Sequence, residues 1–275
     1  MPGMTPEIPS ALSPLVRRIV ASNPSAMTGP GTNTYLVGVD EVAVIDPGPD
    51  DKRHIDAIIG AATAERVRWV LLTHTHPDHS PGTARLVAAT GAEVLAYSKR
   101  DSSAKVNRAI GDGDVVNGTE FSIDVLHTPG HVSNHLCFLL TEERFLFTGD
   151  TILDGMYSVV ARSTGGDMAE YMATLERLRK KRLSRIAPGH GEVIEAPRER
   201  IDDYLRHRRE REAQILKLIR REGPIRIKAI VANIYVDTPA ALLDVAARQV
   251  HAHLIKLRSE NLVTGRDARS VWTAF

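Results

Sequence analysis

The sequence predicts an α/β domain over residues 1–196, followed by a small winged-helix-like module over residues 197–275. Short β-branched runs alternate with segments of helical apolar spacing from about residue 35 to residue 190, which is typical of an α/β chain. The character of the chain changes near Pro197, where a long Arg-rich segment begins. The last stretch, LVTGRDARSVWTAF, holds two β-prone runs around a Gly-containing turn and favours a hairpin.

The spacing of apolar residues predicts the helices and strands of the first domain. Tyr171, Leu175 and Leu178, for example, recur at helical spacing. Helices are expected at Lys52–Thr63, Gly82–Thr90 and Met168–Lys181. Strands are expected at Thr34–Val39, Glu41–Ile45, Arg66–Thr73, Glu93–Ala96, Ser122–Leu126, Leu136–Leu140, Arg144–Thr148 and Arg185–Ala187.

Three helices are expected in the second part, before the hairpin. The first runs from Arg198 to Glu222 and ends at Gly223-Pro224, which is a strong stop signal. The second spans Ile227–Ile234, and the third spans Pro239–Asn261, with proline at a favoured first helical position. Three helices and a hairpin in so short a segment indicate a helix-turn-helix module with a wing.

Composition excludes several classes of protein. The 275 residues are 43% hydrophobic and 25% charged, which excludes a disordered or fibrous chain. A single cysteine, Cys137, excludes a disulfide framework and a Cys-rich metal site, and its apolar surroundings predict a core position. No signal peptide and no apolar run of spanning length stand out, so we expect a cytoplasmic protein without a membrane segment.

The strongest chemical signal is the segment LLTHTHPDH. His74 and His76 follow an apolar run, and strand alternation predicts that both point to one side and chelate a single metal ion. Asp78 and His79 are expected at the start of the next helix, within reach of a second ion. Four ligand-type residues in six positions are hard to explain by packing.

Four further apolar runs end in a histidine or aspartate beside glycine or proline. They supply Asp46, His131, Asp150 and His190. A turn after a strand can expose a metal-ligating side chain, so that the side chain is not buried without a hydrogen-bond partner. Together with the first cluster, these residues provide enough nitrogen and oxygen ligands for two metal ions.

This motif set, in this order, resembles the metallo-β-lactamase superfamily over roughly residues 15–195. Gly31-Thr32-Asn33-Thr34-Tyr35, His127-Thr128-Pro129-Gly130-His131 and the three-helix tail are most similar to the β-lactamase-like protein 2 group, which carries a C-terminal winged helix. The resemblance implies a four-layer αβ/βα sandwich of two mixed sheets.

The resemblance also implies roles for the ligand-type residues. One Zn²⁺ would be held by His74, His76 and His131, the other by Asp78, His79 and His190, and Asp150 would bridge them. Iron and manganese are the alternative metals. A hydroxide between the ions would be the nucleophile. Asp78 would orient this nucleophile or accept its proton, and Asp46 would orient a ligand through hydrogen bonds.

The resemblance to the β-lactamase-like protein 2 group, together with the charge of the C-terminal module, implies single-stranded RNA as the substrate, and a small acyl compound is the alternative. Residues 197–275 hold 16 Lys and Arg against 10 Asp and Glu, a net charge of +6, while the rest of the chain has a net charge of −5. A basic module suits a polyanion. Asn33, Thr34 and His135 are the predicted substrate contacts. The winged helix could equally serve a homodimer.

Three hypotheses compete with endoribonuclease activity. The first is a small-molecule hydrolase: a thioesterase or a lactonase, for which the resemblance implies a bridging carboxylate such as that of Asp150, or a weak β-lactamase. The second is a nucleic-acid-binding regulator whose metal centre is structural. An iron-dependent oxygenase is a further alternative, because histidine and carboxylate ligands accept iron.

Overall fold

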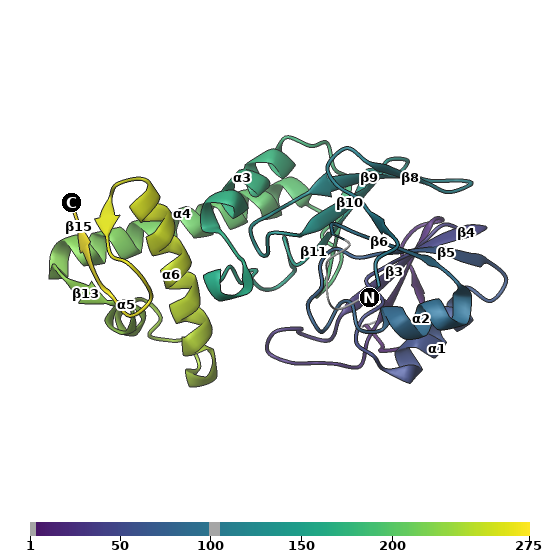
Figure 1. Ribbon diagram of the computed structural model, residues 1–275, viewed down its shortest axis with the longest axis horizontal. Coiled ribbons are helices and arrows are strands. Elements are labelled where there is room, and N and C mark those ends of the chain that lie inside the picture. The colour runs from purple at the N-terminus through teal and green to yellow at the C-terminus, as the bar shows by residue number, and fades with distance from the viewer. Residues whose placement is uncertain (1–3, 99–104) are drawn as a thin grey trace. The chain divides into compact units, whose positions relative to one another are not determined.

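Two mixed β-sheets form the framework of the computed structural model, which describes residues 4–98 and 105–275 (Figure 1). The first sheet has seven strands in chain order, antiparallel from β1 to β4 and parallel from β4 to β7. Its strands are β1 (Ser10–Ala11), β2 (Val16–Val20), β3 (Asn33–Val37), β4 (Glu41–Ile45), β5 (Arg66–Leu71), β6 (Glu93–Ala96) and β7 (Arg108–Ala109).

The second sheet has the order β12-β11-β10-β9-β8. Only β11 and β12 pair in parallel. The strands are β8 (Val115–Asn117), β9 (Ser122–His127), β10 (Leu136–Leu140), β11 (Phe145–Gly149) and β12 (Arg185–Pro188). The α/β prediction with two mixed sheets is therefore confirmed.

Strand alternation divides the buried residues of the first sheet between two cores. Ala43 and Ile45 of β4 point into a core shared with the second sheet. Val42 and Val44 point to the opposite core, which contains residues of α1 (Lys52–Ala61) and α2 (Thr83–Thr90). The first sheet is thus buried on both faces, which explains why its strands read as continuous apolar runs.

The chain divides into two compact units. The first holds residues up to 128, 134–157 and 182–197, and the second holds residues 129–133, 158–181 and 198–275. The last passage from the first unit into the second follows Pro197, and two shorter segments enter the second unit earlier. One of these segments carries His131.

The second unit contains the winged helix. Its helices are η1 (Arg162–Thr164), α3 (Met168–Arg179), α4 (Pro197–Glu222), α5 (Ile227–Ile234), η2 (Ala240–Leu242) and α6 (Leu243–Ser259). A small sheet of order β13-β15-β14 forms the wing, from β13 (Ile225–Arg226), β14 (Val263–Thr264) and β15 (Val271–Ala274). Figure 1 shows α5, α6 and the wing gathered in the C-terminal part of the chain.

Some predicted elements differ from the structure. β2 was not predicted, because Arg17 and Arg18 interrupt its apolar pattern. Arg17 pairs with Glu65 at 2.6 Å and Arg18 with Glu192 at 2.7 Å. The last helix begins at Leu243 and not at Pro239, after the short η2 turn.

No helix in residues 4–98 or 105–275 combines the length and the hydropathy required to cross a bilayer.

Trp272 is the largest fully buried side chain, and it lies in the core of the winged helix. Gly265 packs on its ring, where a Cβ atom would approach to 2.4 Å.

Replacement of a buried aromatic residue by alanine leaves a cavity, so Trp272→Ala should lower the free energy of unfolding of this module by about 3–5 kcal/mol. Urea unfolding followed by circular dichroism measures the change. Phe275→Ala, at a side chain 77% exposed, is the control and should change little; equal effects would contradict the packing argument.

Candidate metal centre

The predicted ligands follow the carboxyl ends of paired parallel strands. Asp46 follows β4, and the segment containing His74 and His76 follows β5. Asp150 follows β11 and His190 follows β12. Neighbouring parallel strands end at the same edge of a sheet, so each sheet brings two of these loops together.

The loop after β5 differs in one respect from the sequence prediction. The strand ends at Leu71, so His74 and His76 lie in the following loop and not on alternating strand positions. Their rings nevertheless meet, with His74 Nε2 2.9 Å from His76 Nδ1. Asp78 and His79 lie in a turn before α2, which begins at Thr83, rather than at the start of that helix.

Within the first unit, the ligand atoms form two groups. His74, His76 and Asp150 each offer an atom within 4.8 Å of the others, and Asp78, His79 and His190 do the same. Asp150 also borders the second group, because its Oδ1 lies 3.3 Å from Nε2 of both His79 and His190. The carboxylate that was predicted to bridge two ions is thus adjacent to both groups.

Two buried nitrogens test whether a cation fits here. Among the described residues, the buried Nε2 atoms of His79 and His190 form no hydrogen bond, although both lie 3.3 Å from Asp150 Oδ1 and that of His190 lies 3.2 Å from Asp78 Oδ2. Their Nδ1 atoms lie 2.9 Å from Asp46 Oδ2 and 3.2 Å from Gly31 O, respectively. A buried polar atom without a partner is costly unless a ligand satisfies it, so these nitrogens fit a metal ion such as zinc.

Negative charge dominates the second group. Burial opposes a charge on His79, but the carboxylates of Asp150, Asp46 and Asp78 outweigh it and hold the pKa of His79 well above its ordinary value. Burial alone would raise the pKa of Asp78, yet His79 and His190 bring that pKa below its ordinary value. Three carboxylates around two imidazoles create a demand for positive charge.

Asp46 holds His79 rather than reaching the ligand groups itself. Its Oδ1 accepts a hydrogen bond from Thr73 N at 2.8 Å, and its Oδ2 accepts from Thr73 Oγ1 at 2.6 Å and from His79 Nδ1 at 2.9 Å. Thr73 Oγ1 also lies 3.0 Å from His74 Nδ1. One carboxylate therefore fixes the rings of two predicted ligands, and Thr73 is a supporting residue that sequence analysis missed.

The three predicted substrate contacts are buried inside the protein. Asn33 donates from Nδ2 to Pro188 O and Gly191 O, both at 2.9 Å, and so holds the loop that carries His190. Thr34 donates from Oγ1 to Asp46 O at 2.6 Å. Their exposed fractions are 1% and 0%. These contacts position ligand loops, which corrects the expectation that both side chains touch a substrate.

His135 is corrected in the same way. It is fully buried and stacks on His74, with ring centroids 5.0 Å apart. Its Nε2 accepts from Asp150 N at 3.2 Å, and its Nδ1 lies 3.0 Å from Thr128 Oγ1. His135 thus supports the backbone of Asp150. Cys137, two residues further on, is fully buried, as predicted.

His54 and Glu7, which sequence analysis did not identify, support the backbone of Asp46 indirectly. His54 is fully buried, with Nε2 2.8 Å from Thr34 Oγ1 and Nδ1 2.7 Å from Glu7 Oε2. Because the Thr34 hydroxyl donates to Asp46, it accepts from His54. A chain of contacts therefore leads from Glu7 to the backbone of Asp46.

His131 lies in the second unit, in the turn before α3. It is 5% exposed, and its Nδ1 is 2.6 Å from Val159 O. A carbonyl accepts only from a protonated nitrogen, so this contact sets Nδ1 as the donor and makes Nε2 the nitrogen that would coordinate a metal.

Comparison with known proteins agrees with this arrangement. Residues 27–190 match the metallo-β-lactamase superfamily, and residues 227–272 match the β-lactamase associated winged helix domain. A β-lactamase-like protein 2 homolog of Caenorhabditis elegans is 33% identical over 273 residues, covering 96% of this chain and 91% of that protein. An atrochrysone carboxyl ACP thioesterase of Aspergillus fumigatus is 35% identical over 222 residues, covering 77% of this chain and 67% of that protein.

Solved structures show the same fold. A metallo-β-lactamase family protein from Thermus thermophilus superposes with a TM-score of 0.80 at 21% identity, covering 96% of this chain and all of that one. A β-lactamase domain protein from Burkholderia ambifaria gives a TM-score of 0.83 at 18% identity, covering all of this chain and 95% of that one. The chain is therefore a member of the metallo-β-lactamase superfamily, a family of hydrolases, and carries the winged helix domain associated with it.

Proposed function

We propose that the protein is a dinuclear zinc hydrolase that cleaves single-stranded RNA. One ion would be held by His74, His76 and His131 and the other by Asp78, His79 and His190, with Asp150 shared between them. The observation that carries the dinuclear proposal is the place of Asp150, whose Oδ1 lies 3.3 Å from both His79 and His190 while the residue also groups with His74 and His76.

Two zinc ions held by these residues would supply an activated water at neutral pH and would stabilise negative charge on the attacked oxygen. Proton transfer is assigned to side chains of the protein. Asp78 is the most accessible carboxylate of the two groups, with its side chain 28% exposed against 13% for Asp150. Its Oδ2 lies 3.2 Å from His190 Nε2 and would face the same ion as that nitrogen, and its other carboxylate oxygen would accept a proton during the attack.

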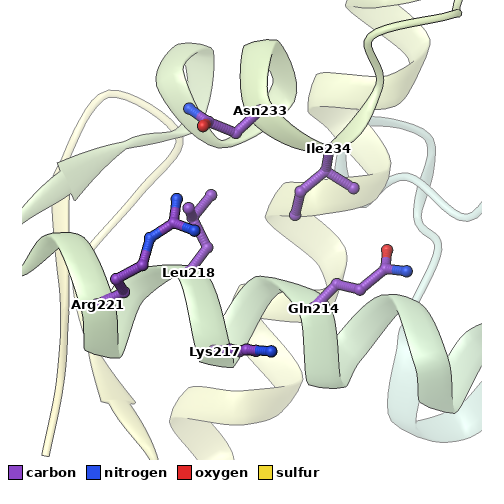
Figure 2. Close-up of a pocket in the computed structure, with 6 residues that line it drawn as sticks. All are labelled: Gln214, Lys217, Leu218, Arg221, Asn233 and Ile234. Carbon is purple, nitrogen blue, oxygen red and sulfur yellow. The ribbon is translucent and has the colours of Figure 1, made fainter.

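The winged helix supports RNA as the substrate. The α4–α5 groove, shown in Figure 2, is lined by Gln214, Lys217, Leu218, Arg221, Asn233 and Ile234. Two cationic and two amide side chains there are exposed. Cations bind phosphates, and amides hydrogen-bond to the edges of unpaired bases, so the groove suits a single-stranded polyanion.

The direct test is cleavage of unstructured RNA by zinc-loaded protein. Cleavage should be lost in Asp78→Ala and in His131→Ala, because each removes a proposed ligand. Elemental analysis of the purified protein should find about two zinc ions per chain, which separates zinc from iron and manganese. RNA that stays intact after prolonged incubation would refute the ribonuclease proposal.

The groove makes a separate prediction. Lys217→Glu with Arg221→Glu should weaken RNA binding at least about tenfold and lower the slope of log affinity against log salt by about 0.7 for each phosphate that the protein no longer neutralises. Filter binding at several salt concentrations measures both quantities. Arg220→Glu with Lys228→Glu makes the same charge change at two exposed residues that do not line the groove, and should weaken binding less. Equal reductions in affinity in both variants would show that only net charge matters.

A thioesterase is the second candidate, and a specific observation favours it. The fungal relative that is 35% identical to this chain is named a thioesterase. A panel of chromogenic thioesters, lactones, esters and a cephalosporin distinguishes the candidates. Turnover of a thioester by a preparation that leaves RNA intact would replace RNA with a small acyl substrate and leave the proposed metal centre unchanged.

A further inference from the structure

The turn that carries His131 is fixed by α3. Asp167 N donates to Gly130 O at 2.9 Å, and Thr174 Oγ1 donates to Pro129 O at 2.8 Å. A Cβ atom on Gly130, which has a φ of +140°, would lie 2.4 Å from Tyr171 Cα, so glycine is required for this close approach. The backbone of the turn therefore rests directly on the helix.

The ring of His131 is fixed by a different segment, Ser158–Val159. Val159 O is 2.6 Å from His131 Nδ1, and Ser158 Oγ is 3.4 Å from the same nitrogen. Rotation of the ring about χ2 is thus limited by the position of one backbone carbonyl. Any residue that sets this short segment also sets the direction of His131 Nε2.

Arg208 of α4 holds that segment. Its guanidinium donates to Ser158 O through Nη2 and to Gln249 Oε1 through Nη1, the latter at 2.6 Å, and it lies over the ring of Tyr171 at 5.3 Å. Ser158 N donates to Tyr204 OH, also on α4, at 3.3 Å. Both polar groups of the Ser158 peptide backbone are therefore held by α4.

The environment of Arg208 is costly for a charged group. The residue is only 2% exposed, and its buried Nε has no hydrogen-bond partner in residues 4–98 and 105–275. Within the part of the chain that the structure describes, no carboxylate lies within ion-pair distance of its guanidinium. A buried guanidinium without a carboxylate destabilises a fold, and an apolar side chain of similar length would serve packing better. The position therefore calls for a reason other than stability.

We propose that Arg208 is a positioning residue for His131, and that its bond to Gln249 makes α6 of the winged helix part of the support of the metal centre. The inference rests on the proposed metal function, since it concerns the direction of a proposed ligand. It gives the winged helix a role besides any contact with substrate. A disturbance of α6 at Gln249 reaches His131 through one side chain and one peptide segment.

The test compares Arg208→Met with wild type by competition against a chromophoric zinc chelator. Loss of a residue that orients a ligand typically costs 10–100-fold in metal affinity, so one of the two bound ions should be weakened by about that factor while the other is unchanged. Arg208→Lys, which keeps a donor for Ser158 O, should recover part of the affinity. Arg206→Met, at a side chain 64% exposed that pairs with Asp203, is the matched control and should bind like wild type.

Gln249→Leu keeps the inference testable if Arg208→Met fails to fold. It should weaken the same ion by a smaller factor, and adding it to Arg208→Met should cause little further weakening, because both substitutions break one chain of interactions. Equal weakening of both ions, or additive effects of the two substitutions, would overturn the proposal.

A measurement on metal-free protein separates this inference from the proposed function. ¹⁵N NMR of the histidine rings should show His131 with its proton on Nδ1 in wild type and a mixture of tautomers in Arg208→Met. An unchanged His131 signal in that variant would overturn the inference. Wild-type protein that binds fewer than two zinc ions would instead refute the dinuclear proposal, and the NMR result would still decide the role of Arg208.

Discussion

Asp150→Ala is expected to abolish hydrolysis, with kcat/KM at least about 1,000-fold lower than in wild type. The proposed shared carboxylate stabilises both ions, and removal of several kcal/mol of charge stabilisation corresponds to about tenfold for each 1.4 kcal/mol. Initial rates on single-stranded RNA, or on the best substrate of the panel, measure the effect. Metal content should fall from two ions towards one in the same preparation.

The control for this change is Asp50→Asn. Asp50 is 54% exposed and pairs with Arg85, in the loop that follows Asp46. The substitution removes a nearby negative charge without touching a proposed ligand, and should leave kcat/KM within about twofold, because exposed ion pairs contribute little. Similar decreases in both variants would indicate that overall charge, and not the shared carboxylate, supports activity.

Asp46→Ala should have the second largest effect, on stability and metal binding together. Three buried donors, from Thr73 N, Thr73 Oγ1 and His79 Nδ1, lose their acceptor. Each unsatisfied donor costs about 1–3 kcal/mol, so the free energy of unfolding should fall by about 3–5 kcal/mol after partial relaxation. Denaturant unfolding of the metal-free protein measures this decrease.

Asp46→Asn separates the two effects. With its oxygen at the Oδ1 position, the carboxamide still accepts from Thr73 N, but its NH₂ group cannot accept from Thr73 Oγ1 or from His79 Nδ1. Part of the stability should therefore return, while zinc affinity should remain about 10–100-fold below wild type. An Asp46→Asn protein that binds both ions as tightly as wild type would contradict the assignment of Asp46 as the residue that orients His79.

The ligand-type residues could be predicted because four of them stand within six positions of the sequence. Packing does not produce that density of histidine and aspartate, and the remaining proposed ligands share one local pattern, an apolar run that ends at a turn. The α/β fold followed from the same runs, since strands buried on both faces keep long apolar stretches. Both predictions depended on signals that are local in the chain.

The supporting residues could not be predicted, because their partners are distant in sequence. Asn33 contacts Pro188 and Gly191, which lie 155 and 158 residues further along. A polar residue in a Gly-rich turn looks the same in sequence whether it faces a substrate or holds another loop. His135 and Thr34 were misassigned for the same reason. The strand β2 was missed because its two arginines are paired with glutamates that are distant in the sequence, and these ion pairs form only in the folded protein.

The division of the chain into compact units bears on how this protein can be shortened or recombined. The two family matches, residues 27–190 and 227–272, lie on either side of α4. This suggests that the C-terminal part could be removed after residue 196 as a separate domain. The segments 129–133 and 158–181 nevertheless cluster with residues 198–275, and α3 packs against α6. Removal of the C-terminal part would strip these segments of their packing partners. The winged helix is thus a folding partner of the hydrolase sequence, and a truncated hydrolase should be insoluble or lack order around His131.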